Sequence, residues 1–176
     1  MNFTHIGNIP IGLCKKELAS FKEKDWDHYT FRQDTFKVHE HTRTIPLIFD
    51  KDFRNTNPTH HDHYETFAKS LKNITTILKN KYGDGQIIRA LLILLKMRSS
   101  IPPHIDKGPS LELCHRIHIP IMTTSRVLFT IDQETKCLKE GEMWEINNSQ
   151  KYHSVINKSR YARVHLVVDW VTACDI

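Results

Sequence analysis

The sequence is poor in cysteine, and its cysteines form no motif. The four of them lie far apart, at Cys14, Cys114, Cys137 and Cys174, with no Cys-x-x-Cys pair. This spacing excludes a zinc knuckle and gives no sign of a disulfide framework. It indicates a protein that works in a reducing compartment.

Long apolar runs are also missing. The longest, Ala90 to Leu95, is far shorter than the roughly 20 residues that a membrane-spanning helix needs. The first residues contain no basic segment followed by an apolar one, as a secretory leader would. We therefore expect a cytoplasmic protein with no membrane partner.

The charge of the chain is not concentrated in any region. Its 25 basic and 20 acidic residues give a net charge of +5, and the lysines are scattered apart from short pairs such as Lys15-Lys16. No stripe of basic and aromatic residues is present, so we expect no nucleic-acid partner. A mildly basic surface is compatible with a small acidic ligand.

The 176 residues contain no repeat, no low-complexity tract and no visible linker, which predicts one domain over 1–176. Within it we expect a helical and edge-strand part over 1–86 and a β-barrel core over 87–176. Residues 15–29 predict a first helix and 34–49 a strand, in which Pro46 requires an edge or a bulge. A polar loop over 50–63 follows.

The main helix is predicted over 64–82, where apolar residues recur at spacings of three and four, and Gly83 ends it. From there on the pattern is of short strands separated by turns, at 87–97, 111–122, 127–131, 142–146, 152–156 and 161–171. Short strands at this spacing predict a mainly β protein, a double-sheet barrel of the jelly-roll type backed by helices.

A possible metal site centres on His104 and Asp106. In an extended segment these side chains, two residues apart, point the same way. His153, further along, supplies a third ligand if the intervening chain folds back as antiparallel strands. Two histidines and a carboxylate form the facial triad of non-heme Fe(II) oxygenases. The spacing alone favours an ordinary polar loop over a metal site. The histidines of the loop at 50–63 are likewise better explained by a solvated loop than by a metal site.

Two later strands share an Arg-x-His pattern. Arg116 and His118 occupy one face of the first strand, Arg163 and His165 one face of the second, and branched apolar residues fill the opposite faces. If those apolar faces pack under helices, the arginines point into the barrel, where each needs an anionic partner. That partner is either a nearby acid such as Asp169 or the carboxylate of a ligand.

The region from about 97 to 170 resembles the aspartyl/asparaginyl β-hydroxylase family of Fe(II)/2-oxoglutarate-dependent oxygenases. Five blocks carry the resemblance, in order: Pro103-His104-Ile105-Asp106, Arg116-Ile117-His118-Ile119-Pro120, Gly141 to Asn148, His153, and Arg163 to Asp169. The family fold is a double-stranded β-helix. The resemblance implies that His104, Asp106 and His153 are iron ligands and that Arg163 binds the distal carboxylate of 2-oxoglutarate.

By the same resemblance, Arg116 and His118 lie where the family contacts the other end of the cosubstrate; a role for His165 is left open. The implied activity is O₂-dependent hydroxylation of an unactivated carbon in an amino acid, an amino-acid derivative or a peptidyl side chain, with release of succinate and CO₂. The rival readings are a non-catalytic barrel that binds a small acidic ligand and a cupin-like isomerase or hydrolase. We expect the loop at 50–63 and residues 107–110 to frame the substrate entrance.

Overall fold

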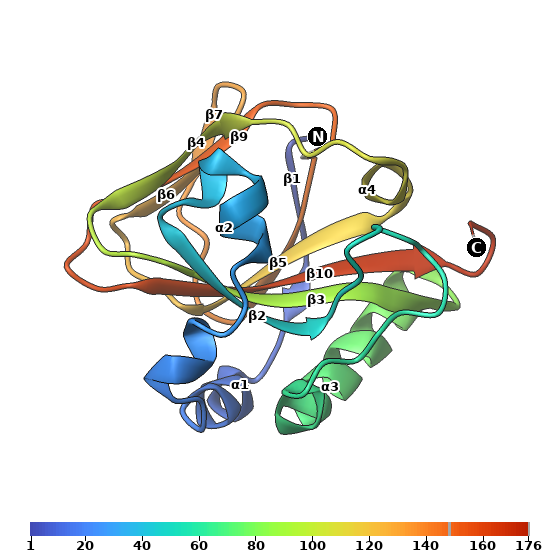
Figure 1. Ribbon diagram of the computed structural model, residues 1–176. Helices are drawn as coiled ribbons and strands as arrows, with labels where there is room; N and C mark the ends of the chain where they lie inside the picture. The colour runs from blue at the N-terminus through green and yellow to red at the C-terminus, as the bar shows by residue number, and fades with distance from the viewer. Residues whose placement is uncertain (148, 176) are drawn as a thin grey trace.

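A computed structural model describes residues 1–147 and 149–175, which form two antiparallel sheets facing one another (Figure 1). The larger sheet has six strands in the order β1-β8-β5-β10-β3-β2, and the smaller has four in the order β4-β9-β6-β7. The strands are β1 Phe3–Asn8, β2 Thr42–Ile48, β3 Gly85–Leu95, β4 Ser99–His104, β5 His115–Met122, β6 Val127–Ile131, β7 Glu134–Lys136, β8 Glu142–Ile146, β9 His153–Asn157 and β10 Arg163–Thr172. The expected mainly β, two-sheet architecture is confirmed.

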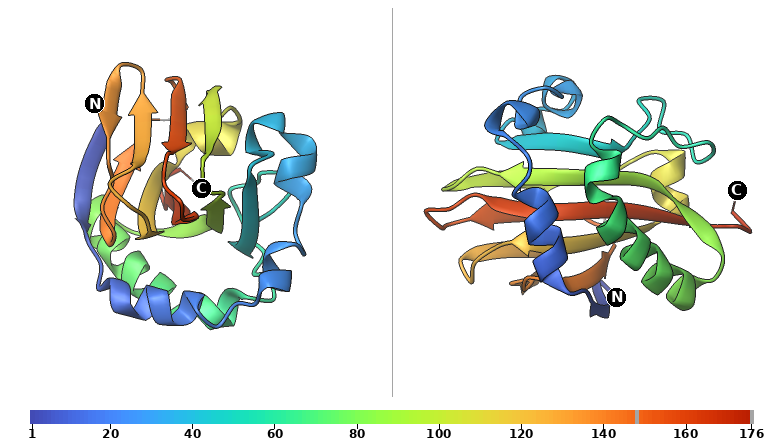
Figure 2. Two further views of the ribbon diagram at one scale, coloured as in Figure 1. Left: turned by 90° about the vertical axis from the view of Figure 1, so that its left-hand side faces the viewer. Right: turned by 90° about the horizontal axis from the view of Figure 1, so that it is seen from below.

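Two helices cover the outer face of the six-stranded sheet, α1 (Ile11–Leu18) and α3 (Tyr64–Tyr82), as both views of Figure 2 show. The bounds of α3 are those that the sequence predicts. Its backbone turns at Gly83, whose φ of 89° lies in the region that glycine adopts without strain. Among the described helices, none is long and apolar enough to cross a membrane.

The outer face of the six-stranded sheet forms the main apolar core. Ile117 and Ile119 of β5 and Leu166 and Val168 of β10 pack with the buried side of α3. Because strand residues alternate between faces, the intervening Arg116, His118, Arg163 and His165 belong to the inner face, between the sheets. The alternation predicted from the sequence is therefore confirmed.

The N-terminal part differs from the prediction. The helix expected over 15–29 is divided into α1 and a 3₁₀ turn, η1 (Glu23–Trp26), and the strand expected from residue 34 begins only at Thr42. Residues before it form α2 (Phe31–Thr35) and the 3₁₀ turn η2 (Lys37–His39). Thr42 is paired with Leu95, the last residue of β3, so the residues before Thr42 have no neighbouring strand to pair with.

The position of Pro46 is as predicted. It lies on β2, an edge strand of the six-stranded sheet, next to a register shift between Pro46 and Ile48. An edge or bulge tolerates the missing N–H of proline.

In the second half, the strands at 127–131 and 142–146 match β6 and β8, and the others are shifted at one or both ends. Three short strands, β1, β4 and β7, were not predicted. The strand expected from residue 111 begins at His115, because Gly108 (φ 141°) and Pro109 start the short helix α4 (Pro109–Leu113) instead.

Candidate metal centre and substrate cavity

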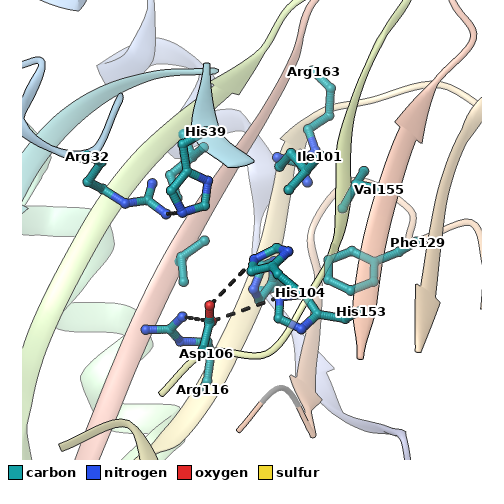
Figure 3. Close-up of a pocket in the computed structure, with 13 residues that line it drawn as sticks. Arg32, His39, Ile101, His104, Asp106, Arg116, Phe129, His153, Val155 and Arg163 are labelled. Atoms are coloured by element: carbon teal, nitrogen blue, oxygen red, sulfur yellow. Dashed lines mark hydrogen bonds and ion pairs between the residues drawn. The ribbon is translucent and has the colours of Figure 1, made fainter. Parts of the chain in front are cut away.

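Strand pairing brings the two candidate histidines together. His104, the last residue of β4, is the direct cross-strand partner of His153, the first residue of β9, and their ring centroids are 4.1 Å apart. Asp106 lies two residues beyond the end of β4, so its direction is set by the following loop rather than by a strand. One ligand atom each from His104, Asp106 and His153 lie within 4.8 Å of one another (Figure 3).

The hydrogen bonds and burial of the histidines suit them to bind a metal. His104 Nδ1 lies 2.8 Å from the carbonyl oxygen of Pro102, so it carries the proton and donates, leaving the Nε2 lone pair free. Nε2 faces Asp106 Oδ1 at 3.5 Å. Burial lowers the pKa of His153 to about 4, which keeps that ring neutral near pH 7. Two imidazoles and one carboxylate fit the donor set of a facial Fe(II) site.

A row of three charged residues supports Asp106. Asp169 of β10 is the cross-strand partner of Arg89 on β3 and of Arg116 on β5. Its carboxylate, which is fully buried, accepts two bonds of 2.7 Å from Arg116 and one from Arg89 Nη1. Arg116 Nη1 in turn donates to Asp106. This row holds the carboxylate of the candidate metal site in place.

These contacts bear on the role of Arg116. Its guanidinium forms ion pairs with Asp106 and Asp169. Its anionic partner is therefore a nearby acid, which is one of the two alternatives that the sequence left open. Asp169 also meets Arg89, a residue that the sequence did not single out. The contact of Arg116 with a cosubstrate stays a prediction.

His118 and His165 lie on the inner face of the six-stranded sheet, between Arg116 and Arg163. Burial lowers the pKa of both well below the ordinary value, so both rings are neutral. Their Nδ1 atoms are 3.5 Å apart, and His118 lies edge-on to Phe129. His118 lines the space beside the candidate metal site, and its cosubstrate contact stays a prediction.

Arg163 is different from the other inner arginines. Its side chain is 2% exposed, and among the described residues no carboxylate lies within ion-pairing distance of it. Its Nε is buried without a hydrogen-bond partner, and burial lowers its pKa to about 9. Asp169, which the sequence offered as a possible partner, binds Arg89 and Arg116 instead.

Two connected spaces adjoin the candidate metal site. A narrow chamber of about 40 Å³ reaches from the His-Asp-His cluster to Arg163 and is also lined by Ile101, Phe129 and Val155. A larger cavity of about 500 Å³ shares Arg32, His104 and Asp106 with the chamber as lining residues. The cavity falls within the range of small-molecule sites.

The predicted substrate entrance stays a prediction. Of the residues expected to frame it, Phe53 and Lys107 line the larger cavity, and much of its wall comes from residues 32–39. The sequence missed these residues because it placed most of them in a strand. The only signal was the partly polar run from Phe31 to His39, which reads equally well as an edge strand.

The histidines of the loop at 50–63 take no part in the centre. His60 stacks on Tyr64, with 3.7 Å between ring centroids, and His61 Nε2 lies 2.9 Å from the carbonyl oxygen of Phe49. Trp170 is fully buried in the core, and Trp144 is partly buried between Phe3 and His5.

Solved structures share this fold across most of the chain. A 2OG-Fe(II) oxygenase family oxidoreductase from Burkholderia pseudomallei matches with a TM-score of 0.66 at 14% identity, over 92% of this chain and 77% of the other. The viral collagen prolyl hydroxylase of Paramecium Bursaria Chlorella virus-1, solved with 2OG, matches with a TM-score of 0.57 at 7% identity, over 98% and 97%. A prolyl-4-hydroxylase from Pseudomonas putida matches with a TM-score of 0.55 at 8% identity, over 97% and 92%.

These likenesses establish the double-stranded β-helix fold predicted from the sequence. No curated protein sequence matches the chain at a significant level. The sequence profile described as Aspartyl/Asparaginyl beta-hydroxylase, however, matches residues 12–172, nearly the whole chain. The chain therefore belongs to the aspartyl/asparaginyl β-hydroxylase family of 2-oxoglutarate-dependent oxygenases.

Proposed function

We propose that this protein is an Fe(II)- and 2-oxoglutarate-dependent dioxygenase that hydroxylates an unactivated carbon of an amino acid, an amino-acid derivative or a peptidyl side chain. Succinate and CO₂ are the expected co-products. The single observation that carries the proposal is the buried, unpaired guanidinium of Arg163 at the end of a chamber that begins at His104, Asp106 and His153.

In this proposal the three clustered side chains hold Fe(II), which supplies the oxygen chemistry that no side chain provides. His104 and His153 bind through nitrogen, and Asp106, oriented by Arg116, supplies the carboxylate. The apolar walls of the chamber, among them Ile101 and Phe129, exclude water from the reacting centre.

Arg163 binds the distal carboxylate of 2-oxoglutarate. An uncompensated buried guanidinium costs several kcal/mol, and the planar fork of arginine matches a carboxylate. At about 40 Å³ the chamber is smaller than ordinary ligand pockets, so it has to widen when the cosubstrate binds.

Substitution of the candidate ligands tests the metal site. His104→Ala and His153→Ala are expected to abolish Fe(II) binding, because each removes one of the two nitrogen donors; Asp106→Ala is expected to retain part of it. Anaerobic titration with Fe(II) measures the effect. His60→Ala, a surface histidine outside the cluster, is the matched control. Full iron binding by either histidine variant would sink the assignment.

Substitution of Arg163 tests the cosubstrate site. Arg163→Ala is expected to weaken 2-oxoglutarate binding about ten-fold or more, because charge-assisted contacts contribute about 1.5–3 kcal/mol, and to leave iron bound. Arg163→Lys should lose affinity too, since an ammonium does not reproduce the fork. Arg126→Gln, on an exposed arginine, is the control. Unchanged cosubstrate affinity in a folded Arg163→Ala protein would make the arginine structural.

The alternative function is that of a non-catalytic protein with the same fold, which binds a small acidic ligand but forms no product. Oxygen-dependent release of succinate, measured while amino acids and peptides are screened, separates the two. A cupin-like isomerase or hydrolase gives no reason for the buried Arg163.

A further inference from the structure

A second arginine reaches the candidate site from a different part of the chain. Arg32 lies in α2, and its Nη2 lies 2.9 Å from His39 Nε2 (Figure 3). The neighbouring Gln33 anchors α2 to the edge strand β2 by hydrogen bonds of 3.1 and 3.2 Å to Thr42 and Thr44. The guanidinium is thus held in a fixed place on the wall of the larger cavity.

Among the described residues, no carboxylate forms an ion pair with Arg32, although the nearby charge of Asp106 stabilises the guanidinium. Its partner His39 offers no negative charge, because Arg32 Nη2 donates to His39 Nε2 and that nitrogen accepts the bond as a lone pair. In the described part of the chain, no carboxylate lies within 4.0 Å of the Arg32 guanidinium, whereas Arg89 and Arg116 each pair with Asp169. Arg32 therefore has a free capacity for an anion, as Arg163 does.

The cavity beside Arg32 combines positive charge with an apolar wall. Besides Arg32, the uncompensated cations on its surface are Lys37 and Lys107, and its one acidic residue, Asp106, already pairs with Arg116. Most of the remaining wall is apolar, contributed by Phe36, Val38, Phe49, Phe53, Leu91, Ile93, Ile105, Leu111 and Val167. Such a surface suits a ligand with one anionic group and an apolar body.

The cavity also opens onto the candidate metal centre. His104 and Asp106 line it, and the ring of His39 lies edge-on to His104 with 5.6 Å between centroids. A ligand anchored at Arg32 therefore lies beside the metal ligands. Arg32 and His39 line both the cavity and the chamber that leads to Arg163.

We propose that Arg32 binds the carboxylate of the substrate, and that the substrate is a small carboxylic acid with an apolar body, such as a free or N-acylated apolar amino acid. The inference rests on the proposed function and narrows its substrate class. The two unpaired arginines then have separate tasks, Arg163 for the cosubstrate and Arg32 for the substrate.

The experiment compares acids with their neutral amides. N-acetyl-L-phenylalanine, N-acetyl-L-leucine and the carboxamide of each are titrated calorimetrically, without oxygen, into protein loaded with Fe(II) and 2-oxoglutarate. We expect at least one acid to bind the unmodified protein ten-fold or more tightly than its amide, because only the acid forms charge-assisted bonds with Arg32. This comparison needs no variant and does not depend on the folding of one.

Three variants assign the preference to Arg32. Arg32→Gln should reduce the ratio of acid to amide affinity to about one, and Arg32→Lys should restore part of it through charge alone. Arg126→Gln, the same change on an exposed arginine, should keep the full ratio. Iron content and 2-oxoglutarate affinity should be unchanged in Arg32→Gln.

Several outcomes overturn the inference. They are equal binding of acids and amides, a full preference in Arg32→Gln, and a loss of 2-oxoglutarate affinity in Arg32→Gln, which would make Arg32 a cosubstrate residue. A failure of the proposed function looks different. In that case the unmodified protein binds no 2-oxoglutarate in the parallel titration, whatever its preference for acids.

Discussion

At the scale of single residues, Asp169 links the core to the candidate metal site. Burial by itself raises the pKa of this carboxyl, but Arg116 and Arg89 outweigh that effect and hold the pKa below its usual range. The ionised group therefore compensates two buried guanidiniums, one of which orients Asp106. The stability of the protein and the geometry of the candidate metal site therefore involve the same side chain.

We expect Asp169→Asn to lower the free energy of unfolding by about 3–5 kcal/mol, because it removes one partner of a buried ion pair and leaves two arginines uncompensated. Fe(II) affinity should fall as well, since Arg116 loses the group that positions it. Urea unfolding and iron titration measure the two effects. Asp62→Asn, on the exposed loop, is the control and should stay within about 0.5 kcal/mol. A decrease of less than about 1 kcal/mol in the unfolding free energy of Asp169→Asn would contradict the stabilising role of the Arg89-Asp169-Arg116 row.

At the scale of elements, β10 organises the six-stranded sheet. It pairs with β3 on one side and β5 on the other, and it carries Arg163, His165 and Asp169 on its inner face. The start of β3 lies close against the end of β10. At Gly85 an added Cβ would come 2.2 Å from the carbonyl oxygen of Val171 and 2.9 Å from the ring of Trp170. Only glycine fits at this position without a shift of the strands.

Gly85→Ala is therefore expected to destabilise the fold by about 1–3 kcal/mol, the usual cost of overpacking. Chemical denaturation followed by tryptophan fluorescence, to which Trp170 contributes, measures the change. Gly12→Ala is the matched control, because an added Cβ in α1 meets nothing within 4 Å, and its effect should be neutral or slightly stabilising. Equal stability of the two variants would mean that β3 and β10 adjust without cost.

At the scale of the whole molecule, buried neutral histidines set the response to acid. His39 is 8% exposed and His165 1%, and burial lowers the pKa of His39 to about 2 and that of His165 well below its ordinary value. In the unfolded chain both titrate near about 6.5. Below that pH the unfolded state binds more protons than the folded state, so stability falls as pH decreases.

Each such histidine is expected to remove about 1.4 kcal/mol of stability per pH unit below about pH 6. His165→Gln should reduce the slope of unfolding free energy against pH by about this amount between about pH 6 and pH 5. Urea unfolding at several pH values, with a chelator present, measures the slope. The control is His28→Gln, on an exposed ring. The same slope in His165→Gln and the unmodified protein would show that the ring is not held neutral.

Local patterns in the sequence were sufficient for much of the fold. The periodic apolar residues of α3 determine its bounds because a helix face forms from neighbours three and four apart, and the Arg-x-His strands show their two faces because strand residues alternate. The residues of the candidate metal site were also found from sequence. His-x-Asp is a local motif, and the family resemblance pointed to His153.

What the sequence alone determined is which side chains belong to each face; which strands lie side by side was decided only by the tertiary structure. The pairing of β4 with β9 places His104 opposite His153, and the row β3-β10-β5 joins Arg89, Asp169 and Arg116. Arg32 was missed for the same reason. Its position depends on where β3 ends, because the chain before Thr42 has no strand to pair with and turns back over the cavity. Contacts between distant segments depend on the packing of the whole chain, and no local pattern contains them.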